Sequence, residues 1–218
     1  MTNNEIALQP GLCYHIFNHA NGFENLFVKE GNYQYFLKKY AQHIHPVADT
    51  FAYCLMPNHF HFLVRVKSLA EIQLSESSKL SESSALLSES SLALSESTVS
   101  LKISKRFANL FSAYAQAFNK QQNRKGSLFV SNFKRKEVSD DWYFARLVHY
   151  IHYNPVKDGF VSHPAEWPHS SFMSLLSEKP TRLLREETVA FFGDRNAFLQ
   201  AHNIEPDDRF LKIVSEWF

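Results

Sequence analysis

The stretch Met56-Pro57-Asn58-His59-Phe60-His61-Phe62-Leu63-Val64 decides the fold. Side chains two residues apart on a strand point to the same side of a sheet, so this alternation predicts a half-buried strand. His59 and His61 then share one face, and Phe60 and Phe62 share the other, which is the expected core face. Two neighbouring imidazoles on a rigid strand can hold one divalent metal ion. The simpler alternative is a pair of polar residues on a solvated sheet face.

A helical pattern follows later in the chain, where residues 141–154 read DWYFARLVHYIHYN. Asp140 or Asp141 suits the start of this helix, and Pro155 predicts its end. The predicted buried stripe has i, i+3, i+4, i+7 spacing and consists of Phe144, Leu147, Val148 and Ile151. Tyr150 and Asn154 lie one turn apart on its flank, whereas Tyr153 lies opposite the stripe, in solvent. Tyr150 alone would be an ordinary boundary tyrosine, but a histidine pair makes it a candidate site residue.

Five motifs, in this order along the chain, resemble the REP-associated branch of the single-tyrosine HUH transposases. They lie at 14–18 (YHIFN), 53–61 (YCLMPNHFH), 126–129 (GSLF), 150–161 (YIHYNPVKDGFV) and 166–168 (EWP). The resemblance runs from about Leu12 to about Ser171, apart from one insert. One position departs from the pattern, because members often have arginine after the asparagine of the first strand, where this chain has His19.

The resemblance implies a site and a reaction. It implies that His59 and His61 bind a divalent metal, Mg²⁺ or Mn²⁺, and that Asn154 completes the metal site. It also implies that Tyr150 is the nucleophile. A tyrosine that attacks phosphorus forms a 5′-phosphotyrosine and releases a 3′-hydroxyl, so the strand can be rejoined elsewhere. The expected function is a transposase that cleaves and rejoins single-stranded, hairpin-containing DNA.

Two other classes of protein remain open at this stage. One is a binding module that recognises a DNA hairpin, as a regulator derived from such a transposase, with inactive histidines. The other is a metallohydrolase that uses His59, His61 and a water molecule, although neither motif has a convincing carboxylate beside it. Covalent attachment of protein to DNA separates the transposase from both, because only tyrosine chemistry produces it.

The net charge of +1 hides an uneven distribution. Residues 102–136 contain nine Lys and Arg residues, aromatic residues between them, and no Asp or Glu. Such a stretch suits a surface that follows phosphates, although a solvated basic helix face is the alternative. Besides Lys120, the basic residues here are the predicted DNA contacts: Lys102, Lys105, Arg106, Arg124, Lys125, Lys134, Arg135 and Lys136.

The predicted elements follow the order β-α-β-β-α-β, and a further helix comes after them. Strands are expected at 12–18, 47–55, 59–66 and 133–138, and helices at 32–45 and 100–123. This order predicts an α+β fold, a ferredoxin-like (RRM-like) antiparallel sheet with helices on one face, plus a C-terminal helical appendage. Residues 1–160 would form the HUH domain, and residues 161–218 an extension packed on it, with helices at 185–192 and 195–202.

An insert of about residues 70–99 interrupts this order. Leu-Ser-Glu-Ser recurs there at 74–77, 80–83, 87–90 and 94–97. The segment is rich in serine and lacks aromatic residues, so it should bury little surface. We expect it to be disordered or to extend the next helix.

Composition sets the remaining expectations. A chain of 218 residues with 44% hydrophobic residues can build one well-filled core. Cys13 and Cys54 are expected to be small buried residues in a reducing compartment, since neither has a Cys-x-x-Cys partner. Without a signal peptide or a membrane-length apolar run, the protein is expected to be soluble and cytoplasmic. We expect it in a prokaryote, nucleoid-associated when bound to DNA, and as a monomer or homodimer.

Overall fold

Four antiparallel strands form one sheet in the computed structural model, which describes residues 6–80 and 96–215. The strand order is β2-β3-β1-β4, and the strands are β1 (Cys13–His19), β2 (Ala48–Leu55), β3 (His59–Val66) and β4 (Lys134–Val138). Helices α1 (Glu30–His43) and α3 (Glu96–Gln121) provide the two crossover connections. The predicted α+β class and ferredoxin-like sheet are therefore confirmed.

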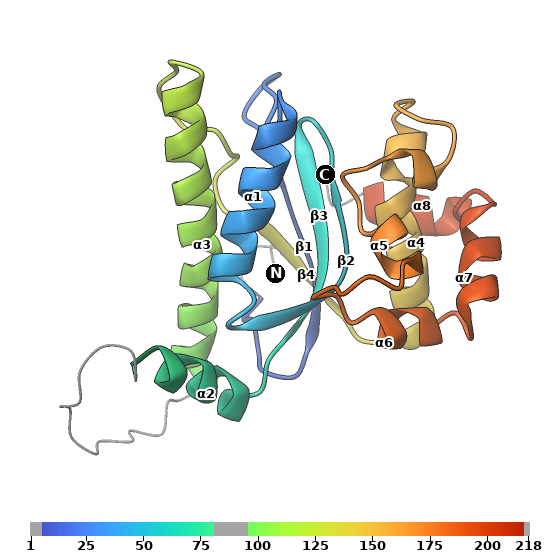
Figure 1. Cartoon of the computed structure of the whole chain (residues 1–218), viewed down its shortest axis with the longest axis horizontal. Coiled ribbons are helices and arrows are strands. Elements are labelled where there is room, and N and C mark those ends of the chain that lie inside the picture. Colours follow the sequence, from blue (N-terminus) through green and yellow to red (C-terminus); the bar gives the residue numbers. More distant parts are fainter. Residues whose placement is uncertain (1–5, 81–95, 216–218) are drawn as a thin grey trace.

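Helices α1 and α3 cover one face of the sheet (Figure 1). Phe60 and Phe62 of β3 are buried in this layer, as the alternation predicted. Phe36 of α1 packs edge-on against Tyr114 of α3, with ring centroids 5.0 Å apart. Fully burying one such aromatic side chain stabilises the fold by roughly 1.5–3 kcal/mol, so this face supplies much of the core.

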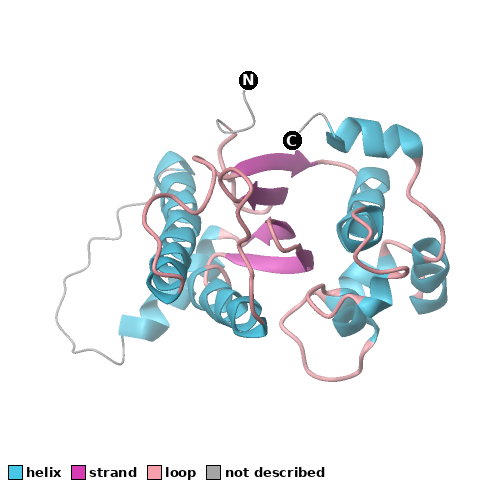
Figure 2. Cartoon of the chain, turned by 90° about the horizontal axis from the view of Figure 1, so that it is seen from above, coloured by secondary structure: helices cyan, strands magenta, loops and turns pink. Residues whose placement is uncertain are grey.

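A second helical layer covers the opposite face of the sheet, which carries His59 and His61 (Figures 1 and 2). It begins with α4 (Asp141–Lys157), and Leu147 and Ile151 of this helix share a core with Phe17 and Leu63 of the sheet. The histidine face is therefore not an open, solvated surface.

A cap defines the start of α4, and a hydrogen bond in its last turn lets the helix continue past Pro155. Asp140 is the N-cap, and its carboxylate accepts a hydrogen bond from the Tyr143 backbone N–H at 2.8 Å. The predicted end at Pro155 is wrong, because the helix continues to Lys157. A proline in the last turn removes only its own hydrogen bond, and the turn closes when Asp158 N–H donates to the Asn154 carbonyl at 3.0 Å.

Short helices complete the second layer after α4. They are η1 (Pro164–Glu166), α5 (Phe172–Leu176), α6 (Arg185–Ala190), α7 (Arg195–His202) and α8 (Asp208–Ser215). The predicted helices at 185–192 and 195–202 are present, the first ending two residues early, whereas α5 and α8 were not predicted. Phe172, Phe198 and Phe210 from these helices join α4 in one core. The division at residue 160 stays a prediction.

The first Leu-Ser-Glu-Ser copy lies in helix α2 (Leu69–Leu80), so the prediction of disorder is wrong there. Ile72 is buried and holds this helix on the core, while Leu74 is exposed. The last copy enters α3, which begins at Glu96, in agreement with an extension of the next helix. The copy at 87–90, and the copy at 80–83 apart from Leu80, lie outside the described residues. Within 6–80 and 96–215, no helix has the length and apolar character that a membrane span requires.

Two buried histidines tie α7 to α4. His152 Nδ1 lies 2.9 Å from His202 Nε2, and His152 Nε2 lies 2.7 Å from Ser171 Oγ. Burial lowers the pKa of His202 to about 3 and that of His152 well below its usual value. Both imidazoles are therefore neutral in the folded protein near neutral pH.

We predict that acid destabilises this layer. In the unfolded chain these histidines take up protons as the pH falls below about 6.5, whereas the folded chain cannot, so the free energy of unfolding decreases with falling pH. Between about pH 7.5 and about pH 5, His202 alone should account for about 2 kcal/mol. Urea unfolding at both pH values measures this loss, and His202→Gln should reduce it. An equal loss in the variant would contradict the prediction.

Candidate active site

The two histidines of β3 lie side by side beneath α4. Their ring centroids are 5.1 Å apart, and His61 is fully buried while His59 is partly exposed. The register of the sheet pairs His59 with His19 and His61 with Phe17 of β1. The side chains therefore sit on a central strand, supported from both sides.

Helix α4 brings Tyr150 and Asn154 to this pair. The Tyr150 ring packs edge-on against His61, with centroids 5.6 Å apart. The Asn154 amide nitrogen donates to the Tyr150 carbonyl at 2.7 Å, which fixes the orientation of the amide. The Asn154 side chain also shifts the pKa of His59, of His61 and of Tyr150. The four predicted site residues therefore converge.

A cavity of about 250 Å³ opens beside these residues. His59, Tyr150 and Asn154 line it together with Lys157 and Asp158. The Lys157 ammonium nitrogen lies 5.8 Å from the Tyr150 ring centroid. Lys157 and Asp158 follow Asn154 by three and four residues, so helical spacing could have identified them. Asp158 also corrects the expectation that no carboxylate lies near the histidines.

Neighbouring side chains engage one nitrogen of each imidazole. Asn58 Oδ1 lies 2.8 Å from His59 Nδ1, and His15 Nε2 lies 3.0 Å from His61 Nδ1. A contact on one ring nitrogen sets which nitrogen can act as a metal ligand, so each ring would use Nε2. His15 and Asn58 were not predicted as site residues, although both lie within the quoted motifs.

Burial has opposite consequences for the two kinds of side chain. It lowers the pKa of His59 to about 4 and that of His61 well below its usual range, so both rings are neutral, as a metal ligand must be. Burial also raises the pKa of Tyr150, and the nearby Asp158 raises it further, while the Asn154 hydrogen bond lowers it. Without an added positive charge, the Tyr150 hydroxyl remains protonated.

The donor set fits a hard divalent cation with an amide ligand. In the described part of the chain, no three His, Cys, Asp or Glu side chains are arranged to hold a metal. His59 packs edge-on against His61 and lines an open cavity together with Asn154. Mixed nitrogen and oxygen donors with open positions suit Mg²⁺ or Mn²⁺ better than a closed zinc site.

The predicted basic surface is divided in the structure. Lys102, Lys105 and Arg106 lie on α3. The pleat of β4 directs Lys134 and Lys136 to the face that α4 covers, where they lie over the rings of Phe17 and Tyr143. It directs Arg135 to the α3 face, where its guanidinium donates to Ser104 Oγ at 2.8 Å.

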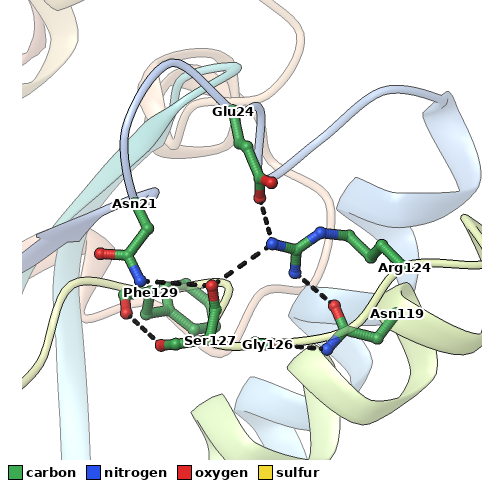
Figure 3. Close-up of polar contacts among 7 residues, drawn as sticks. All are labelled: Asn21, Glu24, Asn119, Arg124, Gly126, Ser127 and Phe129. Carbon is green, nitrogen blue, oxygen red and sulfur yellow. Dashed lines mark hydrogen bonds and ion pairs between the residues drawn. The ribbon is translucent and has the colours of Figure 1, made fainter.

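Arg124, also a predicted DNA contact, is part of an internal network (Figure 3). Its guanidinium pairs with Glu24 and donates to Asn119 Oδ1 and to the Ser127 carbonyl. It therefore joins the end of α3 to two loops. Lys125, the next residue, is exposed. The DNA contacts of these basic residues stay a prediction.

A curated protein from Haemophilus influenzae described as a "Putative REP-associated tyrosine transposase" matches this chain with 28% identity over 126 residues. The chain resembles REP-associated tyrosine transposases. This match confirms the resemblance that the motifs predicted. It covers 57% of the chain and 58% of the relative, so the aligned part spans little more than half of the relative's length. No family model matches the chain.

A solved structure of a REP-associated tyrosine transposase bound to a REP hairpin shares this fold. The TM-score is 0.57 and the sequence identity 14%, and the match covers 81% of this chain and 86% of the other. At this identity the likeness confirms the fold alone. The site is therefore assigned from its own geometry.

We predict that His59 is a neutral Nδ1–H tautomer in the metal-free protein, because Asn58 Oδ1 accepts the proton at Nδ1. Long-range ¹⁵N–¹H correlation spectra of histidine-labelled protein at about pH 7 distinguish the two tautomers and the cation. Asn58→Ala should give a mixture of tautomers. A protonated His59 in the wild type at this pH would contradict both the tautomer and the lowered pKa.

Proposed function

We propose that this protein cleaves and rejoins single-stranded, hairpin-containing DNA, with Tyr150 as the nucleophile and a divalent metal held by His59, His61 and Asn154. The observation that carries the proposal is the meeting of β3 and α4, where the Tyr150 ring packs against His61 and where His59, Tyr150 and Asn154 line one cavity. The similarity to a transposase bound to a REP hairpin supports hairpin DNA as the substrate class.

Each residue of the cavity would have a separate role in such a reaction. When bound, the metal would polarise the scissile phosphate and offset the charge that develops on it. Tyr150 attacks phosphorus from the wall of the cavity, and the bond to the leaving 3′-oxygen breaks. Lys157 lies beside the Tyr150 ring, so its charge favours the phenolate. Asp158 lines the same cavity and can accept the phenol proton.

The first test is covalent attachment. Wild-type protein incubated with labelled hairpin DNA and Mn²⁺ should form an adduct that survives denaturant. Tyr150→Phe should abolish this adduct, because it removes only the attacking oxygen. Tyr153→Phe, three residues along the same helix, should retain it. An adduct in Tyr150→Phe and none in Tyr153→Phe would show that the nucleophile is misassigned.

A second test concerns metal affinity, measured by calorimetry or by the electron paramagnetic resonance of Mn²⁺. His15 acts as a positioning residue that holds His61 through Nδ1. His15→Leu should weaken Mn²⁺ binding by about 10- to 100-fold, the usual cost of losing such support. His15→Gln should retain most of the affinity, because its amide oxygen can accept from Nδ1. Equal affinities in Leu and Gln variants would argue against this role.

A hairpin-binding protein without catalysis is the alternative function. Its supporting observation is the raised pKa of Tyr150, which opposes nucleophilic attack. Tight hairpin binding without any adduct, with every divalent metal tried, would favour this alternative.

A further inference from the structure

Helix α8 lies against α4, the helix that carries Tyr150 (Figure 1). It begins at Asp208, well past the last of the five motifs, which ends at residue 168. Phe210 of α8 is fully buried, and its ring centroid lies 6.3 Å from that of Tyr150, with the two rings inclined at 65°. Aromatic rings favour inclined contacts at separations of about 4.5–7 Å. A segment outside the motifs therefore contacts the side chain of the proposed nucleophile.

The Tyr150 ring has neighbours from three different elements. His61 of β3 meets it edge-on, with centroids 5.6 Å apart, and the Lys157 ammonium of α4 lies 5.8 Å from its centroid. Phe210 is the neighbour from α8. A side chain in a close-packed interior stays in one rotamer because its neighbours fill the space of the others. Without the Phe210 ring, the phenol would have room to turn away from the cavity that it lines.

One face of α4 is directed at α8. Tyr143, Arg146 and Tyr150 have i, i+3, i+7 spacing, so they lie on the same face of the helix. The Phe210 ring lies 5.3 Å from the Tyr143 ring as well as 6.3 Å from the Tyr150 ring. It therefore packs between two side chains that are two helical turns apart, and both limit its own movement.

Further contacts fix α8 on α4. The Asp207 carboxylate accepts a hydrogen bond from the Arg209 backbone N–H at 2.7 Å, at the start of α8, and lies 3.6 Å from the Arg146 guanidinium of α4. Val214, one turn after Phe210, is also fully buried. The helix is thus held near both ends. A side chain can position another one only if its own backbone is fixed in this way.

We propose that Phe210 is a positioning residue for Tyr150, and that its ring holds the phenol in the rotamer that faces the cavity. This inference rests on the proposed function, since it assumes that Tyr150 is the nucleophile. Phe210 is buried and touches neither the DNA nor the metal. Its loss therefore slows the attack on phosphorus and leaves the affinity for DNA unchanged.

The test is the rate of adduct formation in Phe210→Leu, measured in a single turnover with saturating hairpin DNA and Mn²⁺. A small misplacement of a reacting group can cost about 100-fold in rate, and a loss of about this size is expected here. The affinity for the hairpin, measured by fluorescence anisotropy, should equal that of the wild type. Phe210→Tyr, which retains the ring, should retain most of the rate.

Phe198→Leu is the matched control. Phe198 is fully buried in the same core and is lost to the same residue type, but its ring packs on Phe172 and His202, with centroids 5.6 Å and 4.2 Å away. This variant should cleave at the wild-type rate, and thermal unfolding should show that both Leu variants fold. If either lacks a cooperative transition, Met replaces Leu at both positions, because its long, flexible side chain fills more of the space. The loss in Phe210→Met should be about tenfold.

A second measurement does not depend on activity. Protein labelled with ¹³C at the tyrosine Cζ gives one signal for each of the nine tyrosines, and Tyr150→Phe identifies the signal of Tyr150. Phe210→Leu should shift or broaden this signal, because the ring then samples more than one rotamer. Phe198→Leu should leave it unchanged.

The outcomes separate this inference from the proposed function. An equal loss of rate in Phe210→Leu and Phe198→Leu would make Phe210 an ordinary core residue and overturn the inference. A rate in Phe210→Leu that equals or exceeds that of the wild type also overturns it, as does an unchanged Tyr150 signal. In each of these cases the wild-type adduct leaves the proposed function standing. A wild type that forms no adduct with any divalent metal removes both.

Discussion

The pleat of β3, buried on both faces, is the constraint on which the other features depend. Phe60 and Phe62 fill the layer under α1 and α3, and His59 and His61 must then face the other layer. A shift of one residue in the pairing with β1 would place phenylalanines under α4 and imidazoles in the aromatic core. The energy of burying the phenylalanines therefore holds the histidines beneath Tyr150.

Burial under α4 helps the imidazoles and hinders the phenol. Burial keeps His59 and His61 neutral, as metal ligands must be. It also raises the pKa of the Tyr150 hydroxyl, although a nucleophile must lose this proton to attack. A single cation in the cavity would relieve this conflict, since it binds neutral imidazole and stabilises phenolate. Lys157 lies near the Tyr150 ring, and the charge of Asp158 acts against that of Lys157. These electrostatics support the proposal that the site binds a cation.

Much of the fold and of the site could be predicted from the sequence, because both depend on local periodicity. Strand alternation placed His59 and His61 on one face, and helical spacing placed Tyr150 beside Asn154. The residues that were missed have two different causes, a tertiary contact in one case and a helix predicted to end too early in the other. His15 meets His61 only because β1 pairs with β3, and Asp158 enters the cavity only because α4 continues past Pro155. The C-terminal helices were also hard to place, since their apolar residues fit a layer that no local pattern specifies.

The distribution of charge on the surface was also harder to predict from the sequence than the strands and helices. The acid-free stretch at 102–136 suggested one continuous surface, but alternation along β4 sends Lys134 and Arg135 to opposite faces of the sheet. Arg124 pairs with Glu24, an acid far away in the sequence. Basic residues that are adjacent in the sequence are thus divided between the two faces of the sheet, and some of their charge is neutralised by acids from elsewhere in the chain. What remains is positive charge on both faces of the sheet, with Lys105 on the α3 side and Lys157 at the cavity. A polyanion such as the proposed DNA substrate would meet positive charge on either face of the sheet.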